Sequence, residues 1–273
     1  MKKRVITGAV LTILVVSVIF LNIPIFDTLV VFLLSIVGMY EYNKAFKSAG
    51  YNLVPFIGYL SCFEVFLIGL NLDYSKILTI ISFGLPIIVI LSFIYAVLTK
   101  LKTNIVDVAL SVFSVIYIPV MFSFLKLILN LENGRLYIWF VIFGAFACDT
   151  FAYLIGSKFG KNKLCPDVSP NKTIEGSIAG IIGVILSYII IYIIAKYCLN
   201  ISLNIWLVIL MAISTGIVGQ FGDLAESALK RFCKIKDSGK IIPGHGGVLD
   251  RFDSIMFIAP VVYMILKVYM HIF

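Results

Sequence analysis

Long unbroken apolar runs are the feature that most constrains this chain. None of them alternates apolar with polar residues at a period of two. A backbone inside a bilayer must satisfy its own hydrogen bonds, so such runs are typical of membrane-spanning helices of about 20 residues each. The apolar fraction of 61% suffices for roughly eight to ten spans. The charged fraction of only 13% excludes an ordinary water-soluble domain.

Polar, proline and glycine-rich breaks divide the chain into candidate spans. They predict an all-α polytopic membrane protein with about nine transmembrane helices. The predicted spans are Val5–Leu21, Thr28–Tyr42, Leu53–Leu70, Ile77–Leu98, Ile105–Leu129, Leu136–Ile155, Ile174–Tyr197, Ile205–Leu224 and Asp250–Tyr269.

The basic residues gather on one side of these nine spans. Seventeen of the 22 Lys and Arg residues fall in the N-terminal stretch and in every second connection after it. Because cytoplasmic loops carry an excess of Lys and Arg, the N-terminus and the polar loops 157–173 and 231–248 are predicted to be cytoplasmic. We therefore expect a multi-pass protein of the cell (inner) membrane. The net charge of +8 then indicates orientation and not a nucleic-acid partner.

The two halves of the chain differ in the polar residues that they carry. Residues 1–135 hold about five spans that offer little beyond apolar packing, whereas residues 136–273 hold the polar motifs. Glu64 lies inside the third span, where a carboxylate is costly, and a protonated or helix-paired acid is the favoured interpretation. The five cysteines form no CxxC pair, so we predict neither a zinc site nor a disulfide framework.

The first polar motif lies at the end of the eighth span. Asp223, Glu226 or Ser227, and Lys230 are spaced so that they share one face of a helix. This face indicates a common site, although a solvated, salt-bridged helix end has the same pattern.

A glycine-rich segment follows. Residues 243–247 read Pro-Gly-His-Gly-Gly, and glycines let backbone N–H groups approach an anion closely. A helix predicted to start near Asp250 turns its positive dipole end to the same place, which favours phosphate. Asp250 and Asp253 are three residues apart on that helix. Their carboxylates suit a hard cation such as Mg²⁺, which is bound by few carboxylates together with phosphate oxygens.

The second polar motif lies between Asp149 and Glu175. Asp149 interrupts an apolar run, and an ionisable residue there is a candidate for a functional site. The following loop carries several lysines and the sequence Ser-Pro-Asn-Lys-Thr at residues 169–173. This composition suits a polyanion. A positively charged cytoplasmic loop followed by a helix cap would explain it equally.

Both motifs resemble those of phosphatidate cytidylyltransferases, also called CDP-diacylglycerol synthases. Residues 227–253 read S-x-L-K-R-x4-K-D-S-G-x3-P-G-H-G-G-x-L-D-R-x-D, which is similar to the family's C-terminal signature. Residues 149–176 resemble the family's other polar block, except that Asn171 stands where the S-P-K-K-T pattern has Lys. The resemblance covers about residues 149–263.

The resemblance implies a reaction between CTP and phosphatidate that gives CDP-diacylglycerol and pyrophosphate. It implies Mg²⁺ as the cofactor, with a second cation left open, and no covalent nucleophile. His245 would move a proton or hold a turn. The implied metal ligands are Asp223, Asp250, Asp253 and Asp149. The implied catalytic residues are Asp223, Asp250, Lys230, Arg251 and His245. The implied phosphate-binding residues are Lys172, Thr173, Ser227, Arg231, Lys236, Lys240, Gly246, Gly247 and Ser254.

Three other functions fit the sequence less well. A CTP-dependent lipid-alcohol kinase shares the setting but transfers the γ-phosphoryl group. A CDP-alcohol phosphotransferase would carry a D-G-x2-A-R motif, which is absent. A secondary transporter predicts inverted repeats and broken helices, and neither is visible. The expected partners are CTP, phosphatidate and membrane lipid, with no nucleic acid; a homodimer is left open.

Overall fold

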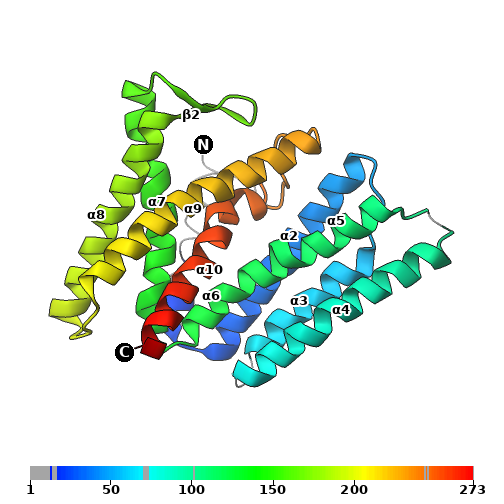
Figure 1. Cartoon of the computed structure of the whole chain (residues 1–273), viewed down its shortest axis with the longest axis horizontal. Helices are drawn as coiled ribbons and strands as arrows, with labels where there is room; N and C mark the ends of the chain where they lie inside the picture. The colour runs from blue at the N-terminus through cyan, green and yellow to red at the C-terminus, as the bar shows by residue number, and fades with distance from the viewer. Residues whose placement is uncertain are drawn as a thin grey trace. The chain divides into compact units, whose positions relative to one another are not determined.

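The computed structural model describes residues 13, 17–69, 74–100, 102–242, 244 and 246–272, without the side chains of residues 69, 74–81, 271 and 272. Nearly all regular structure in this part of the chain is helical, which confirms the predicted class (Figure 1). Six of the described helices are long and apolar enough to cross a membrane. These six helices carry large exposed apolar side chains, such as Trp206 (75% exposed) and Phe146 (63% exposed). The chain is therefore a multi-pass membrane protein.

The chain forms two compact units. The first unit comprises residues 1–130 and 230–251, and the second comprises residues 131–229 and 252–273. The segment after the predicted eighth span is thus grouped with the N-terminal helices. The predicted functional division at residue 135 stays a prediction.

The first unit is built from helices that match the second to fifth predicted spans. Val5–Leu21, the predicted first span, lies mostly outside the described residues, so the count of nine stays a prediction. The helices are α2 (Pro24–Ser48), α3 (Pro55–Gly69), α4 (Tyr74–Leu98), α5 (Ile105–Val115), the π-helical segment η1 (Ile116–Val120) and α6 (Met121–Leu129).

Local sequence explains where these helices begin and bend. Pro24 begins α2, a position where its missing N–H costs nothing. Asn104 and Asp107 form a capping box at the start of α5, each side chain accepting the other's backbone N–H at 2.9 Å. Pro119 lies within η1; because it cannot donate to the preceding turn, the wider π register there is expected.

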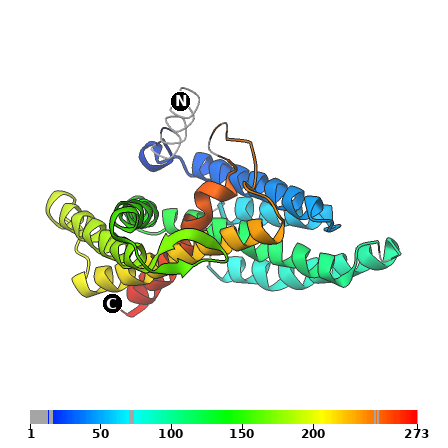
Figure 2. The ribbon, with the colours of Figure 1, turned by 90° about the horizontal axis from the view of Figure 1, so that it is seen from above.

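Helix α3 lies against α2, α4 and α5, as Figures 1 and 2 show. Val54, Ile57, Ile88 and Val115 form an apolar core between these helices. The buried Lys126 of α6 donates to the carbonyl of Pro24 at 3.2 Å, which ties α6 to the start of α2. The first unit is thus a packed helical bundle.

The second unit contains a feature that the sequence did not predict. The helices are α7 (Gly134–Phe159), α8 (Ile174–Cys198), most of α9 (Ile205–Phe232) and most of α10 (Leu249–Ile272). Between α7 and α8, strands β1 (Lys163–Cys165) and β2 (Ser169–Thr173) form an antiparallel hairpin, with Lys163 opposite Thr173. The segment 157–173, expected to be an irregular loop, is therefore a helix end followed by a hairpin.

Helices α7 and α8 pack extensively along one another. Gly183 of α8 lies against the ring of Phe151, where a Cβ atom would come within 2.5 Å. Tyr188 donates to the carbonyl of Phe140 at 2.7 Å. Gln220 of α9 donates to the carbonyl of Ser177 in α8 at 3.1 Å. These contacts hold α7, α8 and α9 against one another.

Candidate functional site

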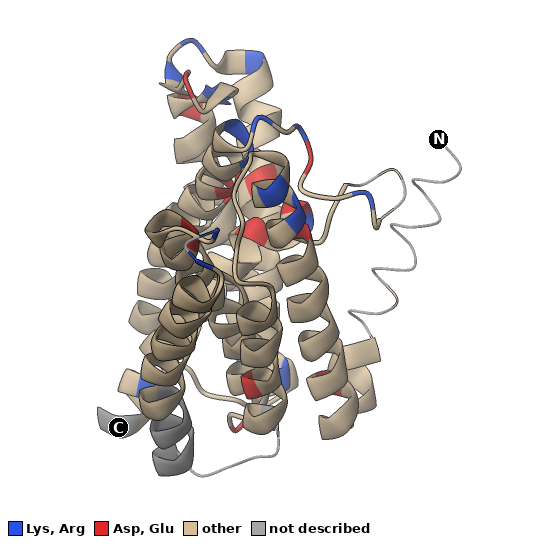
Figure 3. Ribbon diagram, turned by 90° about the vertical axis from the view of Figure 1, so that its right-hand side faces the viewer, with Lys and Arg blue, Asp and Glu red and all other residues tan. Residues whose placement is uncertain are grey.

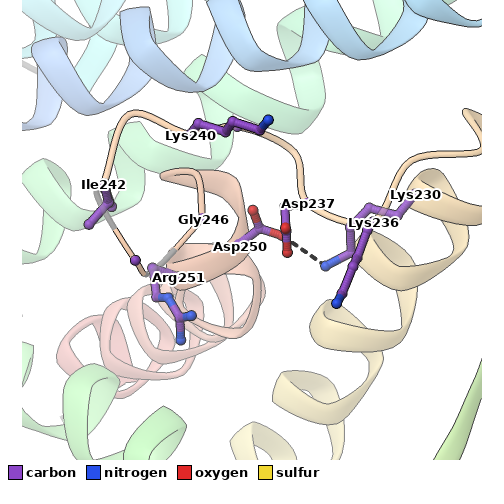
Figure 4. A pocket seen from close by; sticks show the side chains of 10 residues that line it. Lys230, Lys236, Asp237, Lys240, Ile242, Gly246, Asp250 and Arg251 are labelled. Atoms are coloured by element: carbon purple, nitrogen blue, oxygen red, sulfur yellow. Dashed lines mark hydrogen bonds and ion pairs between the residues drawn. The ribbon is translucent and has the colours of Figure 1, made fainter. Parts of the chain in front are cut away.

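A cavity of about 700 Å³ in the first unit brings much of the C-terminal motif together. Lys230 reaches it from the end of α9, and most other lining residues come from the loop between α9 and α10 (Figure 4). The cavity is lined by Lys230, Lys236, Asp237, Gly239, Lys240, Ile242, Gly244, Gly246, Asp250 and Arg251.

Asp250 organises this loop through both of its carboxylate oxygens. Its Oδ1 pairs with the ammonium of Lys230 at 2.8 Å, as the dashed line in Figure 4 shows. Its Oδ2 accepts the backbone N–H groups of Ser238 at 2.9 Å and Gly247 at 2.8 Å. Gly246 has φ +85°, and a Cβ atom there would lie 2.8 Å from Asp250 Oδ2. A side chain at that position would disturb both the turn and the carboxylate.

The cavity has a positive electrostatic balance. Four of its lining residues are cationic, namely Lys230, Lys236, Lys240 and Arg251, and two, Asp237 and Asp250, are anionic. Such a surplus favours a polyanion.

Two backbone N–H groups near the start of α10 have protein acceptors. The N–H of Leu249 donates to Glu41, and that of Gly247 donates to Asp250. Phosphate binding by Gly246, Gly247 and this helix start stays a prediction.

A second polar cluster lies in the second unit. Lys172 of β2 forms an ion pair with Asp223 of α9 at 2.5 Å. The charges of Asp223, Glu226 and Asp149 all act on Asp253 of α10. Asp149 and Asp223, two more of the four predicted metal ligands, therefore lie within electrostatic range of Asp253, and so does the buried Glu226. These four acidic residues form the acidic cluster.

Ser254 lies next to this cluster. Its hydroxyl oxygen is buried and has no hydrogen-bond partner among the described residues. A buried hydroxyl without a partner is costly in a native protein, and it is available to donate to a ligand oxygen. Its role as a donor to phosphate stays a prediction.

The hairpin and the start of α8 hold Lys172 in place. The hydroxyl of Thr173 is the N-cap of α8 and accepts the N–H of Gly176 at 3.2 Å. The carboxylate of Glu175 accepts the Asn162 side-chain amide at 2.9 Å, which closes the hairpin base. The hairpin segment is basic, with Lys161 before β1, Lys163 in β1 and Lys172 in β2; Figure 3 colours Lys and Arg blue. Thr173 is only 7% exposed, so its first task in the structure is to cap the helix.

The chemistry of the acidic cluster fits Mg²⁺. Among the residues that the structure describes, no three His, Cys, Asp or Glu side chains are grouped so that they could hold one metal ion by themselves. Mg²⁺ usually takes one or two carboxylates and completes its shell with water and substrate phosphate. One or two of the clustered carboxylates would therefore be enough. The metal assignment stays a prediction.

Other predicted residues either lie outside the described residues or do not line the cavity. His245 and Pro243 lie outside the described residues. Arg231 is exposed at the end of α9 and does not line the described cavity. Ser227 lies on the same helix and is half-buried. The helical conformation predicted for residues 223–230 is confirmed, since α9 runs unbroken to Phe232.

One residue of the site was missed. Glu41 of α2 is fully buried and accepts the N–H of Leu249 at 3.0 Å, so it contacts the loop that forms the cavity. The sequence contains a signal for it, because a carboxylate within an apolar run is costly unless it has a task. The helices of residues 1–135 therefore contribute more than the apolar packing that their sequence predicts.

Comparison with known proteins extends the resemblance beyond the polar motifs. A model of the Cytidylyltransferase family matches residues 2–269. A phosphatidate cytidylyltransferase of Bacillus subtilis (strain 168) is 32% identical over 271 residues, which cover 98% of each chain. One from Staphylococcus epidermidis (strain ATCC 35984) is 35% identical over 272 residues, covering 97% of this chain and 99% of that protein. The similarity therefore includes the N-terminal helices, and is not confined to residues 149–263.

Proposed function

The chain belongs to the Cytidylyltransferase family, and from this premise we propose that it transfers the cytidylyl group of CTP to phosphatidate. The products are CDP-diacylglycerol and pyrophosphate. The observation that carries the proposal is the cavity of the first unit, whose four cationic residues come from the C-terminal motif. Its volume of about 700 Å³ lies within the usual range for small-molecule sites.

In this reaction the protein positions two polyanions and neutralises their charge. The phosphate oxygen of phosphatidate attacks the α-phosphorus of CTP, and pyrophosphate leaves. Lys236, Lys240 and Arg251 would bind the triphosphate, and Lys230, held by Asp250, would have a fixed position beside it. A phosphate monoester is mostly ionised near neutral pH, its second pKa being about 6, so no general base is required.

The second unit carries further predicted phosphate-binding and metal-binding residues of its own. Lys172 would contact phosphate once substrate competes with Asp223, and Ser254 would donate a hydrogen bond. One or two of the carboxylates of Asp149, Asp223 and Asp253 would hold Mg²⁺. When bound, Mg²⁺ polarises a phosphoryl group and neutralises the charge that develops on the leaving pyrophosphate.

We place this chemistry at the cytoplasmic face of the cell's inner membrane. Phosphatidate reaches the site from the bilayer, and CTP reaches it from water. The basic hairpin and the loop between α9 and α10 follow the excess of Lys and Arg expected on that side. This orientation places the N-terminus in the cytoplasm.

Labelled CTP tests the proposed function. Purified protein in detergent would be incubated with phosphatidate, MgCl₂ and CTP labelled at either the α- or the γ-phosphate. We expect the α-label in CDP-diacylglycerol and the γ-label in pyrophosphate. A γ-label recovered in lipid would instead identify a lipid kinase, and no label in lipid from either nucleotide would overturn the proposal.

A further inference from the structure

Glu41 contacts the loop between α9 and α10 and the first residue of α10. It belongs to α2, 208 residues before Leu249, whose N–H its Oε2 accepts at 3.0 Å. Both residues belong to the first unit, and the Glu41 side chain is fully buried. The contact lies one residue before Asp250. Two carboxylates therefore hold the same stretch of chain, Asp250 from within the loop and Glu41 from α2.

Two glycines of the loop lie directly against the Glu41 carboxylate. A Cβ atom at Gly239 would collide with Oε1, and a Cβ atom at Gly247 would collide with both oxygens. Neither glycine has a positive φ angle, so backbone conformation alone does not require glycine there. The close approach of Glu41 explains both glycines.

The contacts of Glu41 are unlike those of a residue that only stabilises the fold. Oε1 is buried and has no hydrogen-bond partner in the described part of the chain. A buried carboxylate oxygen in that state carries a large desolvation cost, and such groups in native proteins call for a functional explanation. An apolar side chain would pack against α10 without this cost. It would not accept the N–H of Leu249.

We propose that Glu41 is a positioning residue for nucleotide binding. By holding Leu249 and packing between Gly239 and Gly247, it sets the course of the loop that carries Lys236 and Lys240 toward the triphosphate. It does not touch the substrate. This inference rests on the proposed function, because it assigns the loop to CTP.

A double-mutant cycle between Glu41 and Gly239 tests this role. Full-length protein would be purified as wild type, Glu41→Ala, Gly239→Ala and the double variant, and the Kd for CTP with MgCl₂ and the KM and kcat would be measured. We expect Glu41→Ala to weaken CTP binding about tenfold, because a buried N–H loses its acceptor. Gly239→Ala should weaken it by a similar factor in the wild type. In the Glu41→Ala background it should have an effect of less than about twofold, because the collision is gone.

Two further variants separate positioning from folding. Glu41→Gln keeps the size of the side chain and one acceptor oxygen, so it should restore most of the CTP affinity that Glu41→Ala loses. Glu64→Gln is the matched control, because Glu64 is another carboxylate of the first unit and lies against Gly84 of α4. It should leave the Kd for CTP unchanged. If Glu41→Ala does not fold, Glu41→Gln and Gly239→Ala still report on the contact.

The possible outcomes are distinct. CTP affinity within twofold of wild type in Glu41→Ala, or additive effects in the double variant, would overturn the inference. If wild type makes CDP-diacylglycerol and Glu41→Ala is unaffected, the inference fails and the proposed function stands. If the wild type makes no CDP-diacylglycerol and the coupled losses of CTP binding still occur, the proposed function fails and the positioning role of Glu41 stands.

Discussion

Asp250 joins the end of α9 to two parts of the loop, and its two oxygens have different partners. The ammonium of Lys230 needs the negative charge, whereas the N–H groups of Ser238 and Gly247 need only an acceptor. The side chain of Asp250 is 8% exposed, so water cannot readily replace these partners. This arrangement gives Asp250 a structural task, in addition to the metal-binding task that its spacing from Asp253 predicts.

Asp250→Asn separates these two tasks. The amide would present N–H groups either to Lys230 or to the loop, so we expect kcat/KM to fall about 10- to 100-fold. If Asp250 also binds the metal, the MgCl₂ concentration for half-maximal activity should rise. An unchanged MgCl₂ dependence alongside lost activity would limit Asp250 to the loop, and unchanged activity would contradict both roles. Asp167→Asn, on the exposed hairpin turn, is the control.

Spacing along the chain predicted individual contacts only where one helix carries them. The helical placement of Asp223 and Lys230 was predictable from their seven-residue separation. The partners of these residues were not. Lys172 reaches Asp223 across 51 positions of sequence, and Glu41 reaches Leu249 across 208. Such pairs depend on which helices pack together, and the period of an apolar run does not specify this.

Among the secondary-structure elements, the start of α8 links the fold to the second cluster. Thr173 caps the helix, and the residue before it, Lys172, pairs with Asp223. The cap is enclosed, since a Cβ atom at Gly156 would lie 2.9 Å from the Thr173 hydroxyl. The position of Lys172 therefore depends on a well-formed helix end.

Thr173→Ala should loosen this end of α8. Loss of the capping oxygen typically costs about 1 kcal/mol, so the thermal midpoint of the purified protein should fall. Activity should fall with it, because Lys172 loses its fixed position. Thr173→Ser retains the hydroxyl and should restore both quantities. An alanine variant with normal melting and normal activity would show that the cap does not position Lys172.

The same helices show what apolar runs predict well and what they do not. The expected span Ile174–Tyr197 and the observed α8, Ile174–Cys198, differ by one residue, because polar segments bound the run on both sides. By contrast, α9 continues eight residues past its expected end at Leu224, since its polar end is helical as well. The β1–β2 hairpin was not predicted because its strands are short and polar.

At the scale of the whole molecule, sequence order and spatial grouping differ. The loop with the C-terminal motif is grouped with the N-terminal helices, and α9 and α10 each contribute residues to both units. Residues 1–135 therefore do more than pack, since Glu41 contacts that loop. The pattern of apolar and polar residues in either segment does not predict a contact between segments so distant in sequence.

The orientation of the chain in the membrane can be tested with its own cysteines. Cys165 lies in the hairpin segment and Cys198 ends α8, so one helix separates them. The excess of Lys and Arg predicts Cys165 inside and Cys198 outside. Cys198 is exposed, whereas Cys62, Cys148 and Cys233 are buried. Burial also raises the pKa of the Cys233 thiol, which leaves less reactive thiolate at neutral pH.

A membrane-impermeant maleimide applied to intact cells should therefore label Cys198 and spare Cys165. Cys165 should react only after permeabilisation, and Cys198→Ser should abolish the labelling of intact cells. Labelling of Cys165 alone in intact cells would invert the orientation, and equal behaviour of the two cysteines would mean that α8 does not cross the bilayer. The expected result places the hairpin, and with it Lys172, on the side where CTP is available, which the proposed reaction requires.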